Sequence, residues 1–166
     1  MQSFFEDIVG RLVQHQVEFV VVGGMSGVLQ GAPITTRDLD LCYRRSPENI
    51  RRLVTALQPL SPRPRGFPPE LPFFFDERTI QLGSNFTLVV GLEDLDLLGD
   101  MGGLGGYEDV IDAVDEMEVA GFRLYVLSLE QLITTKRSAG RAKDLAVLPT
   151  LEATLAVQRR TVSGHD

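Results

Sequence analysis

The sequence has few residues of the kinds that build cross-linked or zinc-bound sites. Its 166 residues include two histidines, no tryptophan and one cysteine, Cys42. A single cysteine excludes a disulfide within the chain, and no cluster of histidine and cysteine suggests a zinc site. A lone cysteine is typical of a reducing compartment, so we expect a cytoplasmic protein.

Long hydrophobic runs are also missing. The apolar stretches are far shorter than the roughly 20 residues that cross a membrane, and residues 1–7 lack the basic flank of a signal peptide. We therefore expect no membrane association. Hydrophobic residues make up 43% of the chain and charged residues 23%, which is ordinary for a globular protein. We expect a single domain over residues 1–166, ordered through 1–160 and ending in a tail at 161–166.

Basic residues are scarcer than acidic ones, and the two kinds are unevenly spread. The chain has 16 Lys and Arg against 23 Asp and Glu, a net charge of −7, which argues against a surface coated for nucleic acid. Residues 44–65 hold six arginines and one acid, whereas residues 93–118 hold ten acids and no base. Either both runs are solvated surface, or the basic run faces phosphates opposite an acidic, metal-binding lobe.

One segment, residues 18–43, organises the rest of the chain. Its apolar run Phe19 to Val22 predicts a buried strand, which Gly23 and Gly24 end. A short helix is expected from Met25 to Gln30, followed by a second strand that carries the two aspartates of the segment.

The second strand places two carboxylates where they can share a cation. Side chains alternate along a strand, so Asp38 and Asp40 lie on one face. Their repulsion favours a bound cation, and the glycines allow backbone N–H groups to approach an anion such as a phosphate. The pattern indicates metal-assisted phosphoryl or nucleotidyl transfer. We expect the triphosphate beside Gly23 and Gly24, with Ser26 offering its hydroxyl and backbone N–H.

The segment resembles the signature of the nucleotidyltransferase superfamily, in which a Gly-Gly or Gly-Ser turn precedes an Asp-x-Asp strand. It is most similar to the minimal bacterial enzymes of the AbiEii-type and MNT-type toxin–antitoxin systems. The resemblance implies an α/β nucleotidyltransferase-like fold, a mixed twisted sheet flanked by helices, with Mg²⁺ or Mn²⁺ as cofactor. This chain departs slightly from the pattern, because Arg37 directly precedes the first aspartate; Arg37 is a candidate NTP contact.

A third carboxylate is expected from a later strand at residues 94–98. Asp94 and Asp96 lie on the same face of that strand, so alternation alone cannot separate them. Relatives carry an acid between apolar residues here, and Leu95-Asp96-Leu97-Leu98 matches that pattern. The resemblance therefore implies that Asp38, Asp40 and Asp96 are the catalytic and metal-binding residues.

The C-terminal stretch 127–144 extends the likeness. Relatives carry a lysine after a Leu-Ile pair and then a basic Gly-Arg-x-Lys-Asp run. By analogy, Lys136 contacts the nucleotide phosphates, and Arg141, Lys143 and Asp144 support the phosphates or position Lys136. The alternative is a charged helix pair on the surface.

Patterns elsewhere predict further helices. Ser3 caps a helix that ends near Gln14, and His15 is expected at the helix C-terminus or on the surface. Ser46 and Pro47 begin another helix. The remaining helices are expected at 107–114, from Ser128 to about Ser138, and from Arg141 to about Arg160, with Pro149 kinking or splitting the last.

The other segments are predicted as strands and loops. Residues 73–90 are expected to be β-structure interrupted at 83–85, and residues 118–127 a hairpin. Residues 58–72 contain six prolines and are expected to form an extended surface loop near the site. The five glycines of residues 99–106 indicate either a connector or a substrate-facing loop.

These patterns and the resemblance imply one reaction. The expected enzyme transfers a nucleoside monophosphate from an NTP to a hydroxyl acceptor on an RNA or tRNA end, a protein or a small molecule. A cognate toxin or antitoxin is a further expected partner. Two alternatives remain, a catalytically silent interaction module with the same fold and a metal-dependent phosphohydrolase.

Overall fold

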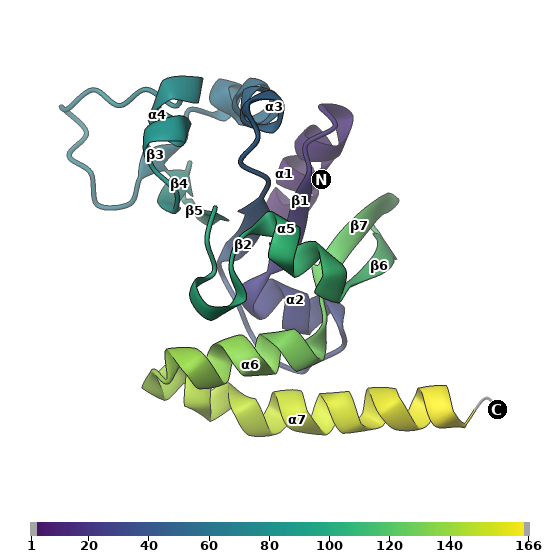
Figure 1. Ribbon diagram of the computed structural model, residues 1–166. Helices are drawn as coiled ribbons and strands as arrows, with labels where there is room; N and C mark the ends of the chain where they lie inside the picture. Colours follow the sequence, from purple (N-terminus) through teal and green to yellow (C-terminus); the bar gives the residue numbers. More distant parts are fainter. Residues whose placement is uncertain (1–2, 165–166) are drawn as a thin grey trace.

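The computed structural model describes residues 3–164 and shows one mixed sheet with helices on both faces (Figure 1). The seven strands follow the order β3-β4-β5-β2-β1-β7-β6. Strand β1 is antiparallel to β2 and parallel to β7, and β2 is parallel to β5. The strands are β1 (Phe19–Val22), β2 (Leu39–Tyr43), β3 (Arg63–Pro64), β4 (Phe86–Val90), β5 (Glu93–Leu98), β6 (Val114–Val119) and β7 (Phe122–Leu127).

The helices pack around this sheet, and none of those within residues 3–164 is long and apolar enough to cross a membrane. They are α1 (Phe4–Gln14), α2 (Gly23–Leu29), α3 (Pro47–Leu57), α4 (Glu77–Leu82), α5 (Tyr107–Val110), α6 (Leu129–Ala139) and α7 (Ala142–Ser163). Short 3-10 turns lie at Gln58–Leu60, Gly102–Leu104 and Ile111–Ala113.

Strand alternation divides the core between the two faces of the sheet. Phe19 and Val21 of β1 join a cluster with the apolar residues of α1, α3 and α4, whereas Val20 and Val22 join a second cluster with α5, α6 and α7. Leu39 and Leu41 of β2 belong to the first cluster. The polar residue between them, Asp40, therefore lies on the face that α6 and α7 cover.

Helices α6 and α7 lie side by side below the sheet (Figure 1). The turn between them needs Gly140, whose φ of 65° lies in the left-handed region that glycine adopts without strain. Pro149 lies inside α7, which continues through it without splitting. At Gly27, a Cβ would lie 3.1–3.3 Å from Leu132, Ile34 and Leu151, so the missing side chain lets α2 pack closely against both helices.

Most predicted elements are confirmed. The hydroxyls of Ser3, Ser46 and Ser128 accept backbone N–H groups at the starts of α1, α3 and α6. His15 caps the C-terminus of α1, with its Nδ1 2.8 Å from the carbonyl oxygen of Arg11. Helix α7 continues to Ser163, beyond the expected end near Arg160, and residues 165–166 of the expected tail lie outside the described residues.

Three predicted segments are wrong in detail. Residues 77–82 form helix α4 instead of a strand, because the Asp76 carboxylate accepts the Thr79 N–H and caps a helix there. The proline-rich segment is not entirely a loop, since Arg63–Pro64 pairs with β4 as strand β3. The helix expected to reach Val114 ends earlier, and Val114 opens strand β6 opposite Leu127.

Candidate active site

The β2–β5 pairing brings two of the predicted carboxylates together. Asp40 and Asp96 are direct Cα partners in the parallel register of these strands. Asp38 immediately precedes β2, two residues before Asp40. Leu95 and Leu97 face the other side of the sheet with Leu39 and Leu41, so both aspartates project from the face that α6 covers.

Asp40 is the most perturbed acid of the site. Burial and, to a smaller extent, the nearby charges of Asp96 and Asp38 raise the pKa of the Asp40 carboxyl from 3.8 to about 7, against the opposing effect of Lys136. Among residues 3–164, its Oδ1 is the one buried side-chain N or O atom without a hydrogen-bond partner. A buried, unpartnered carboxylate oxygen beside two other acids needs a proton or a cation.

The paired glycines make room for side chains around this carboxylate. Gly23 has a φ of 64°, and a Cβ there would overlap Oδ2 of Asp40. At Gly24 a Cβ would lie 2.9 Å from the Thr36 hydroxyl. A larger residue at either position would collide with a neighbouring side chain. Asp40 of β2 fills the space beside Gly23, and Thr36, from the segment before β2, fills the space beside Gly24.

The C-terminal helices contribute a second charged cluster. Asp144 is fully buried and accepts from Lys136 Nζ at 3.2 Å and from Arg141 Nε at 2.6 Å. Burial alone would raise the pKa of the Asp144 carboxyl, but the hydrogen bonds from Arg141 and Lys136 outweigh it and lower that pKa below its ordinary value. The ammonium of Lys136 is thereby fixed beside the carboxylate cluster, where its charge opposes the rise in the Asp40 pKa.

One cavity of about 200 Å³ is lined by Asp40 of the first cluster and by the charged residues of the second. Asp38 and Asp96 lie outside its lining. Five predicted residues contribute to it, namely Gly23, Asp40, Lys136, Arg141 and Asp144. The sequence analysis did not single out Met101, Thr135 or Ala139, which complete the wall with Val22, Leu98 and Leu132. The signal for Met101 was its place in the glycine-rich segment 99–106, for which a substrate-facing loop was one of two options.

Other predicted residues lie outside this lining. Ser26 is fully buried and its hydroxyl donates to the Gly23 carbonyl at 2.6 Å, so that group stabilises the first turn of α2. Arg37 and Lys143 are exposed. Gly24 contacts Thr36.

Arg65 was missed as an individual site residue. Its Nε lies 2.9 Å from Asp94 Oδ1, and its Nη2 lies 2.9 Å from Asp96 Oδ1. Burial raises the pKa of Asp96, while the guanidinium opposes the rise, and the balance leaves that pKa above its ordinary value. Only the pairing of β3 with β4 brings Arg65 here, because nearly 30 residues separate it from these acids.

The other arginines of the basic run make internal contacts. Arg44 pairs with Glu18 and Glu108, and Arg51 with Glu77. Arg45 donates to the Tyr43 hydroxyl and Arg63 to carbonyl oxygens of its own loop. Of this run, Arg65 alone bonds a predicted site residue within residues 3–164.

The donor set suits a hard divalent cation. Carboxylate oxygens are the ligands that Mg²⁺ and Mn²⁺ prefer, and Asp40 offers an unpartnered one. Within residues 3–164 no three acids, histidines or cysteines are gathered closely enough to hold a metal as they stand, and Asp96 is engaged by Arg65. The residues fit a metal provided that Arg65 releases Asp96.

The comparisons with known proteins identify the fold. No family model and no curated protein matches the chain. Among solved structures, a Thermotoga maritima protein classed as a nucleotidyltransferase is 21% identical with a TM-score of 0.56, and the match covers 87% of this chain and 88% of that one. ANT(2")-Ia in complex with adenylyl-2"-tobramycin is 16% identical with a TM-score of 0.59, covering 95% and 91%. The lincosamide antibiotic adenylyltransferase LnuA is 13% identical with a TM-score of 0.58, covering 89% and 93%.

The chain has a nucleotidyltransferase fold. Each of these neighbours is matched over 88–93% of its own length, so the likeness extends well beyond a shared strand–helix–strand unit. Within this nucleotidyltransferase fold, the cavity between Asp40 and Lys136 is the candidate active site.

Replacing Asp40 by Asn should stabilise the metal-free protein at alkaline pH. Since the folded state raises the Asp40 pKa from 3.8 to about 7, its contribution to stability is full below pH 4 and is lost as the pH rises through about 7. Asn removes the buried charge, so Tm should rise by roughly 3–8 °C at pH 8.5 and change little at pH 5. Thermal unfolding in EDTA at both pH values measures this. The exposed Asp112→Asn is the control, and a lower Tm at pH 8.5 would show that Asp40 has a structural role instead.

Replacing Asp144 by Asn should destabilise the protein. The change leaves Lys136 and Arg141 without their shared buried acceptor, which should lower the free energy of unfolding by about 1–3 kcal/mol. Glu152→Gln is the matched control, because Glu152 pairs with Arg137 between the same two helices but is half exposed. That pair should contribute about 0–1 kcal/mol. Urea unfolding at pH 7 compares the two, and equal losses would contradict the assignment of Asp144 as a buried anchor.

Proposed function

We propose that the protein is a cytoplasmic nucleotidyltransferase that moves a nucleoside monophosphate from an NTP to a hydroxyl acceptor, with Mg²⁺ or Mn²⁺ as cofactor. The observation that carries this proposal is the register of Asp40 with Asp96 at the edge of a cavity lined by Lys136. The acids repel one another and would bind the cations that accompany an NTP. The ammonium group of Lys136 would bind the negative phosphates.

The carboxylates of Asp38, Asp40 and Asp96 would hold the metal. When bound, the cation supplies Lewis-acid stabilisation of negative charge on the phosphates. With a pKa of about 7, the Asp40 carboxyl is partly protonated near neutral pH, and a cation that binds there would displace that proton. Asp96 contributes its carboxylate from the adjacent strand once its contact with Arg65 is broken.

The C-terminal cluster would hold the triphosphate. Lys136 is partly exposed to the cavity and is restrained by Asp144, so its ammonium can meet a phosphate without a large loss of side-chain freedom. Arg141 shares the same anchor and keeps most of its side chain exposed. Arg37 and Lys143 are exposed and would have to turn toward the phosphates to bind them. Ser26 would hold the turn at Gly23 in place through its hydrogen bond to the Gly23 carbonyl.

The acceptor is proposed as a hydroxyl group on a small molecule, a protein or an RNA or tRNA end. Two structural neighbours bear names that refer to antibiotics, one bound to adenylyl-2"-tobramycin and one a lincosamide adenylyltransferase. They support transfer of a nucleoside monophosphate to a hydroxyl here. The resemblance to AbiEii-type and MNT-type proteins adds a toxin–antitoxin role with a cognate protein partner to the proposal.

Paired substitutions on β5 test the reaction. The protein is incubated with Mg²⁺, each labelled NTP and cell-extract RNA, protein or small molecules, and both labelled product and pyrophosphate are measured. Asp96→Asn should reduce transfer at least 100-fold, whereas Asp94→Asn should retain it within about fivefold, since removing one metal-binding carboxylate removes charge stabilisation worth several kcal/mol.

The outcomes separate the alternatives. Release of phosphate without pyrophosphate would favour a phosphohydrolase. Absence of any NTP-dependent product with all acceptor pools would favour an interaction module. A larger loss from Asp94→Asn than from Asp96→Asn would reverse the choice of third carboxylate.

Arg65 should compete with the metal for Asp96. Its guanidinium bridges Asp94 and Asp96, and side chains at these positions are about one-third exposed or less. Replacing Arg65 by Gln should therefore strengthen Mn²⁺ binding by roughly two- to fivefold, the value of a partly exposed ion pair. Arg63→Gln is the control, because Arg63 lies two residues earlier, in β3, and its guanidinium donates hydrogen bonds only to carbonyl oxygens. Calorimetric Mn²⁺ titration measures the affinity, and weaker binding to Arg65→Gln would show that Arg65 positions Asp96 for the metal instead.

A further inference from the structure

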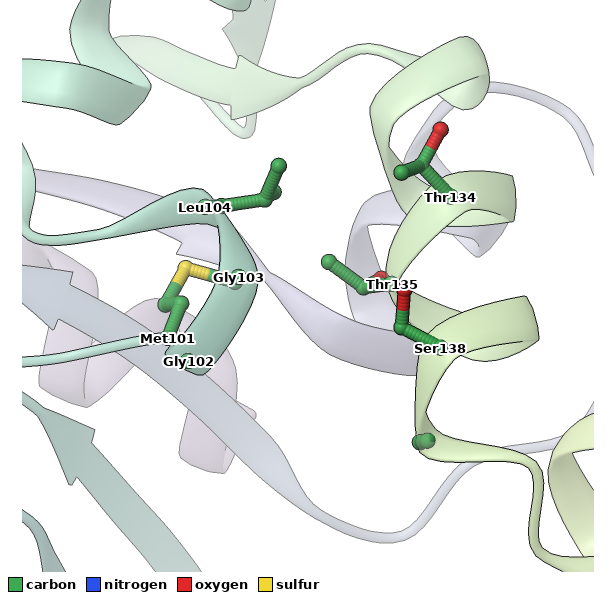
Figure 2. A pocket seen from close by; sticks show the side chains of 8 residues that line it. Met101, Gly102, Gly103, Leu104, Thr134, Thr135 and Ser138 are labelled. Atoms are coloured by element: carbon green, nitrogen blue, oxygen red, sulfur yellow. The ribbon is translucent and has the colours of Figure 1, made fainter.

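A second cavity, of about 340 Å³, adjoins the candidate active site (Figure 2). It lies between the segment that follows β5 and one side of α6. Its lining comprises Met101, Gly102, Gly103, Leu104, Thr134, Thr135, Ser138 and Ala139. We call this cavity the slot. Met101, Thr135 and Ala139 line both the slot and the active-site cavity, so the two spaces are direct neighbours.

The loop wall of the slot is held in place by hydrogen bonds. Asn85 accepts the N–H groups of Gly99 and Asp100 through its Oδ1 and donates to the Asp100 carbonyl. Within the loop, the Met101 N–H donates to the Gly105 carbonyl at 2.8 Å. The slot is therefore a preformed space between two ordered elements.

The slot carries no charged side chain. Met101 and Leu104 form one wall, and Figure 2 shows them facing Thr134, Thr135 and Ser138 of α6. The hydroxyls of Thr134 and Thr135 donate to carbonyl oxygens of their own helix, at 3.1 and 2.7 Å. These two residues thus offer methyl groups and lone pairs to the slot.

The open side of the loop wall exposes backbone. Nothing lies within 4 Å of the positions that a Cβ would occupy at Gly102 and Gly103. The Gly102 N–H already donates to Asp100 Oδ1 at 2.6 Å, and the Gly102 carbonyl accepts from the Gly105 N–H. Gly103 is therefore the part of this wall whose backbone can bond to the edge of a flat ligand, while apolar side chains contact its faces. An uncharged slot of this kind suits a neutral planar group and offers nothing to a phosphate or an ammonium group.

We propose that the slot binds the nucleobase of the NTP, with Met101 and Leu104 against one face of the ring and the α6 residues against the other. This inference rests on the proposed function, because Lys136 on the same helix would hold the phosphates. Asp96 lies on β5 and Arg65 directly follows β3, and neither residue lines the slot, which leaves that charged side for the acceptor.

The test separates recognition of the base from recognition of the phosphates. Binding of each NTP and of inorganic tripolyphosphate is measured by calorimetry with Mg²⁺ for the parent and for Ser138→Leu, which fills the slot at a residue absent from the active-site cavity. The control is Ser163→Leu, because Ser163 is also an exposed helical serine and lies at the far end of α7. Leu104→Ala, which removes a wall of the slot, serves as a second variant.

We expect Ser138→Leu and Leu104→Ala to weaken NTP binding about tenfold or more and to leave tripolyphosphate binding within twofold. Ser163→Leu should change neither. Unchanged NTP affinity in both slot variants, or an equal loss of NTP and tripolyphosphate affinity, would overturn the nucleobase assignment while leaving the proposed function standing. Absence of metal-dependent NTP and tripolyphosphate binding to the parent would overturn both.

Discussion

The structure around the candidate site depends on one unfavourable interaction, the burial of the Asp40 carboxylate beside two other acids. Strand alternation fixes Asp40 on the face that the C-terminal helices cover, and the β2–β5 register fixes Asp96 next to it. The Oδ1 atom of Asp40 is buried without a hydrogen-bond partner, so stabilisation of its negative charge depends on neighbouring charged groups. The pKa of about 7 expresses this conflict, which a protein tolerates at a site that receives cations.

The chain surrounds these acids with cations that are themselves restrained. Lys136 and Arg141 share the buried Asp144, and Arg65 is shared between Asp94 and Asp96. Neither arrangement satisfies the buried oxygen of Asp40. Both groups of ion pairs therefore place positive charge near the site without bonding to this oxygen, and both come from segments distant in sequence from β2.

The sequence predicted what depends on local pattern and missed what depends on strand pairing. The strand that carries Asp40, the caps at Ser3, Ser46 and Ser128, and the break at Gly140 are local and were correct, whereas Asp38 lies just before that strand and not within it. Helix α4 was missed because its apolar residues stand in a stretch rich in phenylalanine, where the cap at Asp76 is a weak signal. Arg65 could not be chosen among six arginines without knowing that β3 pairs with β4. Ser26 was expected to face the phosphates, but the first turn of a helix offers its hydroxyl a carbonyl acceptor nearer than any ligand.

The same helix, α6, separates the chemistry of charge from the recognition of uncharged groups. Successive residues point in different directions around a helix, so Thr134 and Ser138 line the slot while Lys136 points to Asp144 and the acids. Thr135 and Ala139, between these two faces, contribute to both cavities. A ligand that spans the two spaces is thereby positioned along one rigid element, anchored at its start by the Ser128 cap and at its end by the Gly140 turn. Neighbours that are 13–21% identical share the fold over most of this chain, which shows that the fold tolerates extensive sequence change. Substitutions at Thr134 or Ser138 would alter the slot face of α6. They would leave Lys136 in place, because its side chain points from another side of the helix.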